Sequence, residues 1–106
     1  MNIRCAGLVY QPLVSGEVTV TLEVAKTITL TGKALAGAPA PNMYLAIYVD
    51  DALLKDTTYT SVTLNQPYTL TAQYDKSGAH KAYGKMVLSN PLGSKEYVTD
   101  VVYFTV

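Results

Sequence analysis

Residues 42–60 read NMYLAIYVDDALLKDTTYT, and they decide the fold because they hold the clearest strand and the clearest hairpin of the chain. Across residues 43–49, apolar side chains occupy every second position, which is the pattern of a strand with one face in a core. Asp50 and Asp51 then interrupt the run, and aspartate tolerates the left-handed backbone conformation that a tight hairpin needs. Residues 53–60 return as a short polar strand, which is typical of the edge of a sheet.

The alternation of apolar and polar residues recurs along the chain, whereas no segment shows helical periodicity over the roughly ten residues that a helix needs. Two glycines and two prolines at residues 32–41 predict a loop that crosses between sheets. The pattern predicts an all-β domain with seven main strands, at residues 17–24, 27–34, 43–49, 53–60, 67–74, 79–89 and 96–106. This number and spacing favour an antiparallel two-sheet sandwich at residues 17–106, with a small barrel as the alternative. Residues 1–16, with a strand candidate at 3–10, are predicted to form an N-terminal arm or an extra strand.

Length and charge narrow the range of functions. The 106 residues give room for one domain, and eight acidic residues balance eight basic ones, so no field would attract nucleic acid or anionic lipid. Cys5 is the only cysteine, which excludes a disulfide within the chain, and we interpret it as a small buried apolar residue rather than a reactive thiol. The first residues lack the features of a secretion signal, and no run approaches membrane-spanning length. We expect either a domain of a longer exported chain or a small complete protein.

Few residues in the sequence are of the kinds that catalyse reactions or bind metals. His80 is the only histidine, and its place directly after a turn predicts a ring bonded to a loop carbonyl, rather than a base or ligand paired with Cys5 or an aspartate. One histidine, one cysteine and scattered carboxylates do not provide a zinc site. Three carboxylates around the hairpin form a calcium candidate, although we favour a turn whose aspartates cap backbone groups; they are Asp50, Asp51 and Asp56. Without a phosphate-binding loop or a nucleophile elbow, the sequence predicts a non-enzymatic domain with no cofactor.

Tyrosines are the more informative set. If the odd positions of residues 43–49 face the core, Tyr44 and Tyr48 stand on the opposite surface of the same strand. Tyrosines of later strands fall on registers that we also expect to face outward, and the full predicted set is Tyr44, Tyr48, Tyr83, Tyr97 and Tyr103. Because tyrosine offers a large contact area at low entropic cost, this face is a candidate partner-binding surface. Alternatively, the rings only cover the sheet and pair across strands, or an N-terminal arm or neighbouring subunit buries them.

Short motifs at strand ends and turns carry a resemblance. They are Leu30-Thr31-Gly32, Gly37-Ala38-Pro39, the run LAIYVD at 45–50, Tyr68-Thr69-Leu70 and Ser77-Gly78-Ala79-His80. Together they make residues 17–106 resemble the immunoglobulin-like repeats of bacterial and archaeal cell-surface proteins, which implies an immunoglobulin-like antiparallel β-sandwich and a role at a cell surface. The chain departs from those repeats at Asp51, where they carry a turn glycine, and in the order of residues in the 32–41 loop. The paired cysteines and the tryptophan of antibody domains are absent, which excludes a true immunoglobulin.

Two functions fit these observations. The first hypothesis is a non-catalytic binding or structural module of a surface or extracellular protein, acting through a sheet face or loops. The alternative is a small structural subunit of a virion or filament that assembles through sheet faces or edge strands, since the net charge is zero and the chain begins with Met1 without a signal. A small hydrolase or metal enzyme ranks third. We expect a protein partner or self-association, no nucleic acid and no membrane span. The first hypothesis places the protein at the cell surface or outside the cell, and the alternative in a virion or the cytoplasm.

Overall fold

Strands make up all the regular structure of residues 17–106, which are the residues that the computed structural model describes, and this part of the chain contains no helix. The strands are β2 (Val18–Val24), β3 (Thr27–Ala34), β4 (Asn42–Val49), β5 (Ala52–Tyr59), β6 (Pro67–Gln73), β7 (Ala79–Asn90), β8 (Gly93–Val98) and β9 (Val102–Thr105). The predicted all-β fold is confirmed, and the predicted strands from 17–24 to 79–89 correspond to β2 through β7. The predicted arm at 1–16, with its strand candidate and Cys5, lies outside the described residues.

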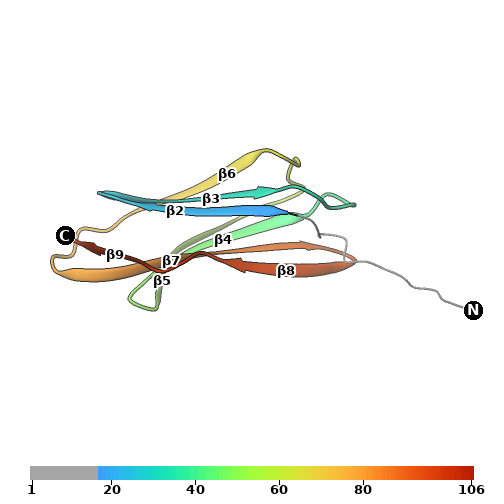
Figure 1. Cartoon of the computed structure of the whole chain (residues 1–106). Helices are drawn as coiled ribbons and strands as arrows, with labels where there is room; N and C mark the ends of the chain where they lie inside the picture. Colours follow the sequence, from blue (N-terminus) through green and yellow to red (C-terminus); the bar gives the residue numbers. More distant parts are fainter. Residues whose placement is uncertain (1–16) are drawn as a thin grey trace, which may run out of the picture.

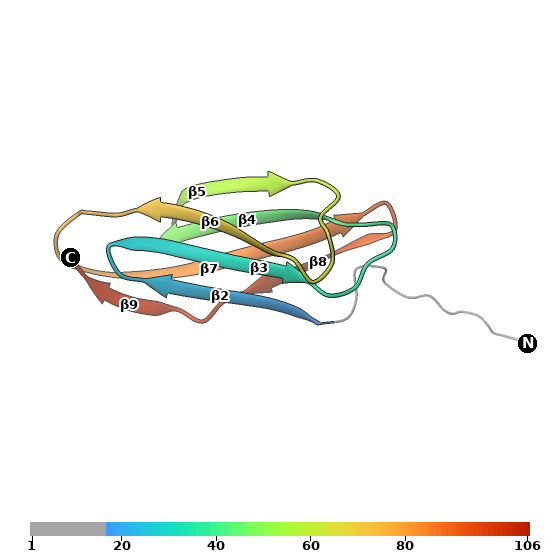
Figure 2. The ribbon, with the colours of Figure 1, turned by 90° about the horizontal axis from the view of Figure 1, so that it is seen from above.

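Two antiparallel sheets pack against each other as two layers (Figure 1). Figure 2 looks down on the three-stranded sheet, β2-β3-β6, which lies over a five-stranded sheet ordered β5-β4-β7-β8, with β9 also paired to β7. The chain crosses between the sheets after β3, β5 and β6. In constant-type immunoglobulin sandwiches the fourth strand lies in the sheet of the first, second and fifth, whereas here that strand, β5, has joined the other sheet beside β4. The predicted two-sheet sandwich is confirmed, and the small barrel is wrong.

The core lies between the sheets and is built from the alternate positions that the sequence pattern marks. Inward residues of β3 and β4 are buried, whereas those of the edge strand β2 are half-buried. The large side chains that are fully buried include Ile28, Leu30, Met43, Leu45, Ile47, Val62, Met86 and Leu88. Each contributes about 1.5–3 kcal/mol relative to exposure. Because a slip of one residue would turn such a strand inside out, this burial also fixes the register of the sheets.

The β4–β5 hairpin has the short turn that the sequence predicts. Val49 pairs with Ala52 across it, and the two loop residues, Asp50 and Asp51, have φ angles of 52° and 66°. Two successive left-handed residues are typical of a type I′ turn, whose twist matches that of the strands it joins. β5 lies at the edge of its sheet, as its polar sequence predicts.

The prediction of a single strand at 96–106 is wrong. The chain forms two strands there, β8 and β9, and the segment between them contains one residue more than the facing part of β7. Consequently Tyr97 pairs with Met86 and packs against the core, while Val98 is 56% exposed, the reverse of the predicted orientation. Beyond the extra residue the predicted orientation holds, since Phe104 packs against the core.

Candidate functional site

The outer face of the five-stranded sheet gathers tyrosine and aliphatic side chains from all of its strands. Tyr48 stands directly opposite Tyr83, and Lys81 opposite Tyr103, so each pair points to the same side. We call this surface the aromatic face; it consists of Tyr44, Tyr48, Leu53, Tyr83, Val87, Val98 and Tyr103, with Lys81, Lys85, Asp56 and Glu96 among them. Tyr103 is 78% exposed.

The structure places all but one of the predicted tyrosines on this face. Tyr97 is the exception, because the extra residue between β8 and β9 reverses the alternation. Its ring packs against the core, and burial raises the pKa of its phenol. Conversely, the sequence interpretation left out Leu53 and Val98, which the pairing with Tyr48 and Lys85 puts on the face. The predicted two-residue turn already implies the position of Leu53, because such a turn pairs Val49 with Ala52 and then Tyr48 with Leu53. No such signal marks Val98, whose orientation depends on the extra residue between β8 and β9.

Two rings form the centre of the aromatic face. Tyr48 and Tyr83 stack with their centroids 4.9 Å apart and their planes 7° from parallel. The ammonium nitrogen of Lys85 lies 5.4 Å from the centroid of the Tyr48 ring, within the range of a cation–π contact. These contacts order the two rings relative to each other and to the ammonium of Lys85.

The charged groups of the aromatic face are paired with neighbours. Nζ of Lys85 lies 3.4 Å from Oε2 of Glu96, and this contact raises the pKa of the lysine. In the same way, Asp51 lies 3.1 Å from Nζ of Lys81 and raises its pKa. The hydroxyl of Tyr44 donates a hydrogen bond to Oδ2 of Asp56 at 2.9 Å. The face therefore presents apolar area between charges that already have partners.

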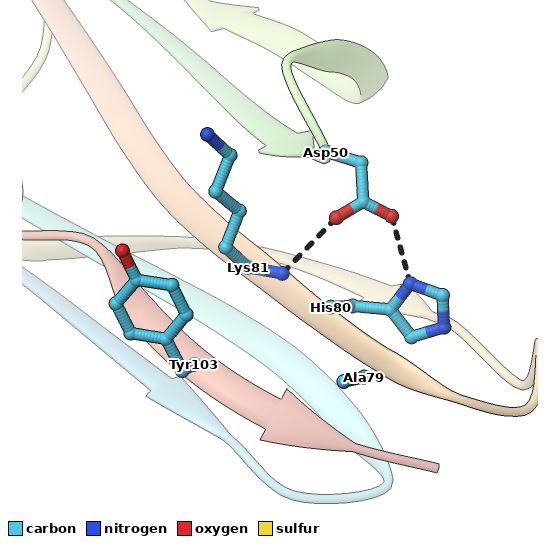
Figure 3. A pocket seen from close by; sticks show the side chains of 5 residues that line it. All are labelled: Asp50, Ala79, His80, Lys81 and Tyr103. Atoms are coloured by element: carbon cyan, nitrogen blue, oxygen red, sulfur yellow. Dashed lines mark hydrogen bonds and ion pairs between the residues drawn. The ribbon is translucent and has the colours of Figure 1, made fainter.

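At one end of the aromatic face lies a shallow hollow of about 300 Å³, lined by Asp50, Ala79, His80, Lys81 and Tyr103 (Figure 3). The hairpin turn brings Asp50 to the start of β7, and Figure 3 shows its carboxylate between the imidazole of His80 and the backbone nitrogen of Lys81. The two carboxylate oxygens accept from Nδ1 of His80 at 2.7 Å and from the Lys81 N–H at 3.1 Å.

His80 contacts two acceptors at once. Beyond the carboxylate of Asp50 on Nδ1, Nε2 lies 2.9 Å from the carbonyl oxygen of Lys76, which confirms the predicted bond to a loop carbonyl. A neutral imidazole has only one N–H, so donation to both acceptors requires the imidazolium. The bond to Asp50 accordingly raises the pKa of His80, and the bond from His80 lowers that of Asp50. The rings of Tyr74 and Phe104 pack against the imidazole, with centroids at 4.8 and 5.6 Å.

These contacts define what the Asp50 and His80 pair can do. A histidine that acts as a general base needs a ring nitrogen free to accept a proton from substrate, and here both nitrogens are engaged within the chain. The backbone N–H of Asp50 also donates to the carbonyl oxygen of Lys81 at 2.9 Å. The pair can therefore fasten the β4–β5 hairpin to β7 and, through the Lys76 carbonyl oxygen, to the segment that connects β6 with β7.

The three carboxylates of the calcium candidate are not brought together. Asp50 faces the histidine, whereas Asp51 points to the ammonium of Lys81. Asp56 lies further along β5 and bonds to Tyr44. Calcium needs several oxygen ligands around one point. Within residues 17–106, no group of three or more histidine, cysteine or acidic side chains could hold a metal ion.

Comparison with known proteins adds no relative. No protein-family model matches the chain, and no curated protein or solved structure does either. In the described part of the chain, no helix has the length and hydropathy to cross a membrane.

Proposed function

We propose that this domain is a non-catalytic binding or structural module of a surface or extracellular protein, and that its contact surface is the aromatic face. The observation that supports this most is the difference between the two outer faces of the sandwich. A sheet that only needs a solvated exterior can be covered by small polar residues, and the three-stranded sheet of this domain is covered in that way.

Threonine dominates the outer face of the three-stranded sheet. One row across it consists of Thr21, Thr31 and Thr69, which pair directly from strand to strand. The corresponding row on the five-stranded sheet consists of Leu53, Tyr48 and Tyr83. Tyrosine is enriched in protein interfaces, because it buries a large area and keeps a polar tip. The chain thus places tyrosine on one exterior and threonine on the other.

Two further observations support the remaining parts of the proposal. A non-catalytic role agrees with the engaged ring nitrogens of His80, because they leave no free base beside the hollow. The resemblance of residues 17–106 to repeats of cell-surface proteins supports a surface or extracellular location. The alternative function, a structural subunit of a virion or filament, draws support from the zero net charge, since identical copies of such a chain do not repel one another at long range.

Hydroxyl-radical footprinting tests the contact surface, with mass spectrometry used to read oxidation at each residue. Two samples are compared: the protein as isolated from its source organism with any bound partner, called the native material, and the purified chain in dilute solution. Leu53, 51% exposed on the aromatic face, is matched by Leu92, which is 61% exposed at the tip of the β7–β8 hairpin. We expect Leu53 and Tyr103 to be protected in the native material while Leu92 reacts equally in both samples. Equal oxidation of Leu53 in the two samples would show that the face is free and would overturn the proposal.

A further inference from the structure

We propose that the partner of the aromatic face is a second copy of this chain, bound face to face about a two-fold axis. This inference rests on the proposed function and names its partner. A two-fold arrangement uses the same patch on both subunits, so one self-compatible surface is sufficient.

The aromatic face has the size that a dimer interface needs. The five strands of its sheet, β4, β5, β7, β8 and β9, contain 8, 8, 12, 6 and 4 residues. At about 3.3 Å per residue and about 4.8 Å between strands, the strands of this sheet cover a projected area on the order of 600 Å². The accessible area is larger than the projection, because side chains stand out from the sheet. It therefore approaches the roughly 800 Å² per partner that stable complexes bury.

The charges of the face favour an identical partner over a highly charged one. Lys81 and Lys85 are paired with Asp51 and Glu96, so burial of the face does not leave either ammonium without a counter-charge. A strongly basic or acidic partner would instead find no uncompensated field to recognise, since the whole chain carries eight charges of each sign. What the face offers is tyrosine and aliphatic area, and the complement of such a surface is another one like it.

Sedimentation velocity of the complete chain over a range of concentrations tests this inference. We expect the mass to rise from 11.4 kDa toward twice that value as concentration increases. A lysine placed at Tyr103 or at Val98 should raise the dimer dissociation constant by about tenfold or more, because burying an unpaired charge is costly. Both positions are exposed, so Tyr103→Lys and Val98→Lys should fold, and the thermal melt of each variant checks that they do. Thr21→Lys adds the same charge on the opposite exterior and should leave the dissociation constant unchanged.

Each alternative outcome has a distinct meaning. A chain that stays monomeric at every concentration overturns the self-association, as does a dimer that is insensitive to both lysine variants or equally weakened by Thr21→Lys, since pairing would then occur at a strand edge or elsewhere. A series of larger species overturns the closed two-fold arrangement. If the chain is monomeric but Leu53 and Tyr103 are protected in the native material, the aromatic face binds a different protein and the proposed function stands.

Discussion

Asp50 and His80, 30 residues apart in the sequence, are joined by a hydrogen bond of 2.7 Å between Oδ2 and Nδ1. One residue belongs to the turn between β4 and β5, and the other to the second position of β7. The second ring nitrogen lies within hydrogen-bond distance of the Lys76 carbonyl oxygen, so the His80 side chain connects the β4–β5 hairpin to the segment between β6 and β7. The stability of this end of the sandwich should consequently depend on the charge of one imidazole.

Stability should fall as the pH rises through the titration of His80. The pKa of His80 is raised in the folded protein, chiefly by the hydrogen bond that its ring donates to Asp50, so the folded state binds this proton more tightly than the unfolded state does. Its contribution is complete below the ordinary histidine pKa of 6.5 and is lost above the raised folded value. The pKa of Asp50 is lowered, so its contribution is present above the ordinary aspartate value of 3.8 and is lost as the pH falls below it. The urea concentration at which half of the protein is unfolded should therefore be highest between pH 3.8 and pH 6.5.

The variant His80→Gln separates this effect from other titrations, because glutamine keeps a donor but does not ionise. Its unfolding midpoint should lack the decline that the wild type shows as the pH rises from 6.5, the ordinary histidine pKa, through the raised pKa of the folded state. An identical decline in the variant would show that another group is responsible.

Asp51→Gly should stabilise the domain by about 0.5–1 kcal/mol, because glycine accepts the left-handed conformation without the steric cost that a β-carbon brings. Asp51 has φ of 66°, and its ion pair with Lys81 is exposed, so its loss costs little. Asp50→Gly is the matched control: its φ is 52°, but the change removes the bonds to His80 and to the Lys81 N–H, and we expect a net loss of stability. Chemical denaturation distinguishes the two, and equal effects would contradict the explanation.

The sequence predicts those parts of the fold in which one face of a strand must be buried. Alternation in residues 43–49 determines which side of β4 is inside, and it therefore places Tyr44 and Tyr48 outside without any knowledge of the neighbouring strands. The same argument succeeds along β7, where the outward positions carry Lys81, Tyr83 and Lys85. Local pattern is sufficient here because burial acts on each strand separately.

Pairing between strands is what local pattern cannot show. The backbone N–H and carbonyl of Gly84 bond to Thr99 at 2.9 Å each, through the threonine hydroxyl and the threonine N–H, and an extra residue follows before β9 begins. Val98 and Val102 are both apolar and suggest one continuous strand, although Asp100 between them interrupts the alternation at the point where the structure breaks it. The inward position of Tyr97, and the contact of Asp50 with His80, depend on pairings between distant residues.

Gly84→Ala should destabilise the domain by about 1–3 kcal/mol, the usual effect of adding volume to a packed core. Gly84 lies on β7 beneath the buried Leu30 of the opposite sheet, and a β-carbon there would overlap the branched end of that side chain. Gly32→Ala provides the comparison, because its β-carbon would come nearest to Sδ of Met86, an unbranched side chain that can adopt another rotamer, and would be 3.0 Å from Cδ2 of Leu45. We expect the smaller loss for Gly32→Ala in urea unfolding; the opposite order would contradict the argument.

Tyr97→Phe should leave stability unchanged or raise it by up to about 1 kcal/mol, because a buried hydroxyl without a partner costs free energy and its removal leaves nothing unpaired. Among the described residues, the hydroxyl of Tyr97 is buried without a hydrogen-bond partner. Tyr59→Phe is the matched variant, since the Tyr59 hydroxyl donates to the carbonyl oxygen of Thr69 at 2.7 Å, and its removal should cost about 0.5–1.5 kcal/mol. The test compares the free energies of unfolding of the two variants with that of the wild type, all measured under the same conditions. A loss for Tyr97→Phe as large as that for Tyr59→Phe would mean that the Tyr97 hydroxyl is hydrogen-bonded in solution.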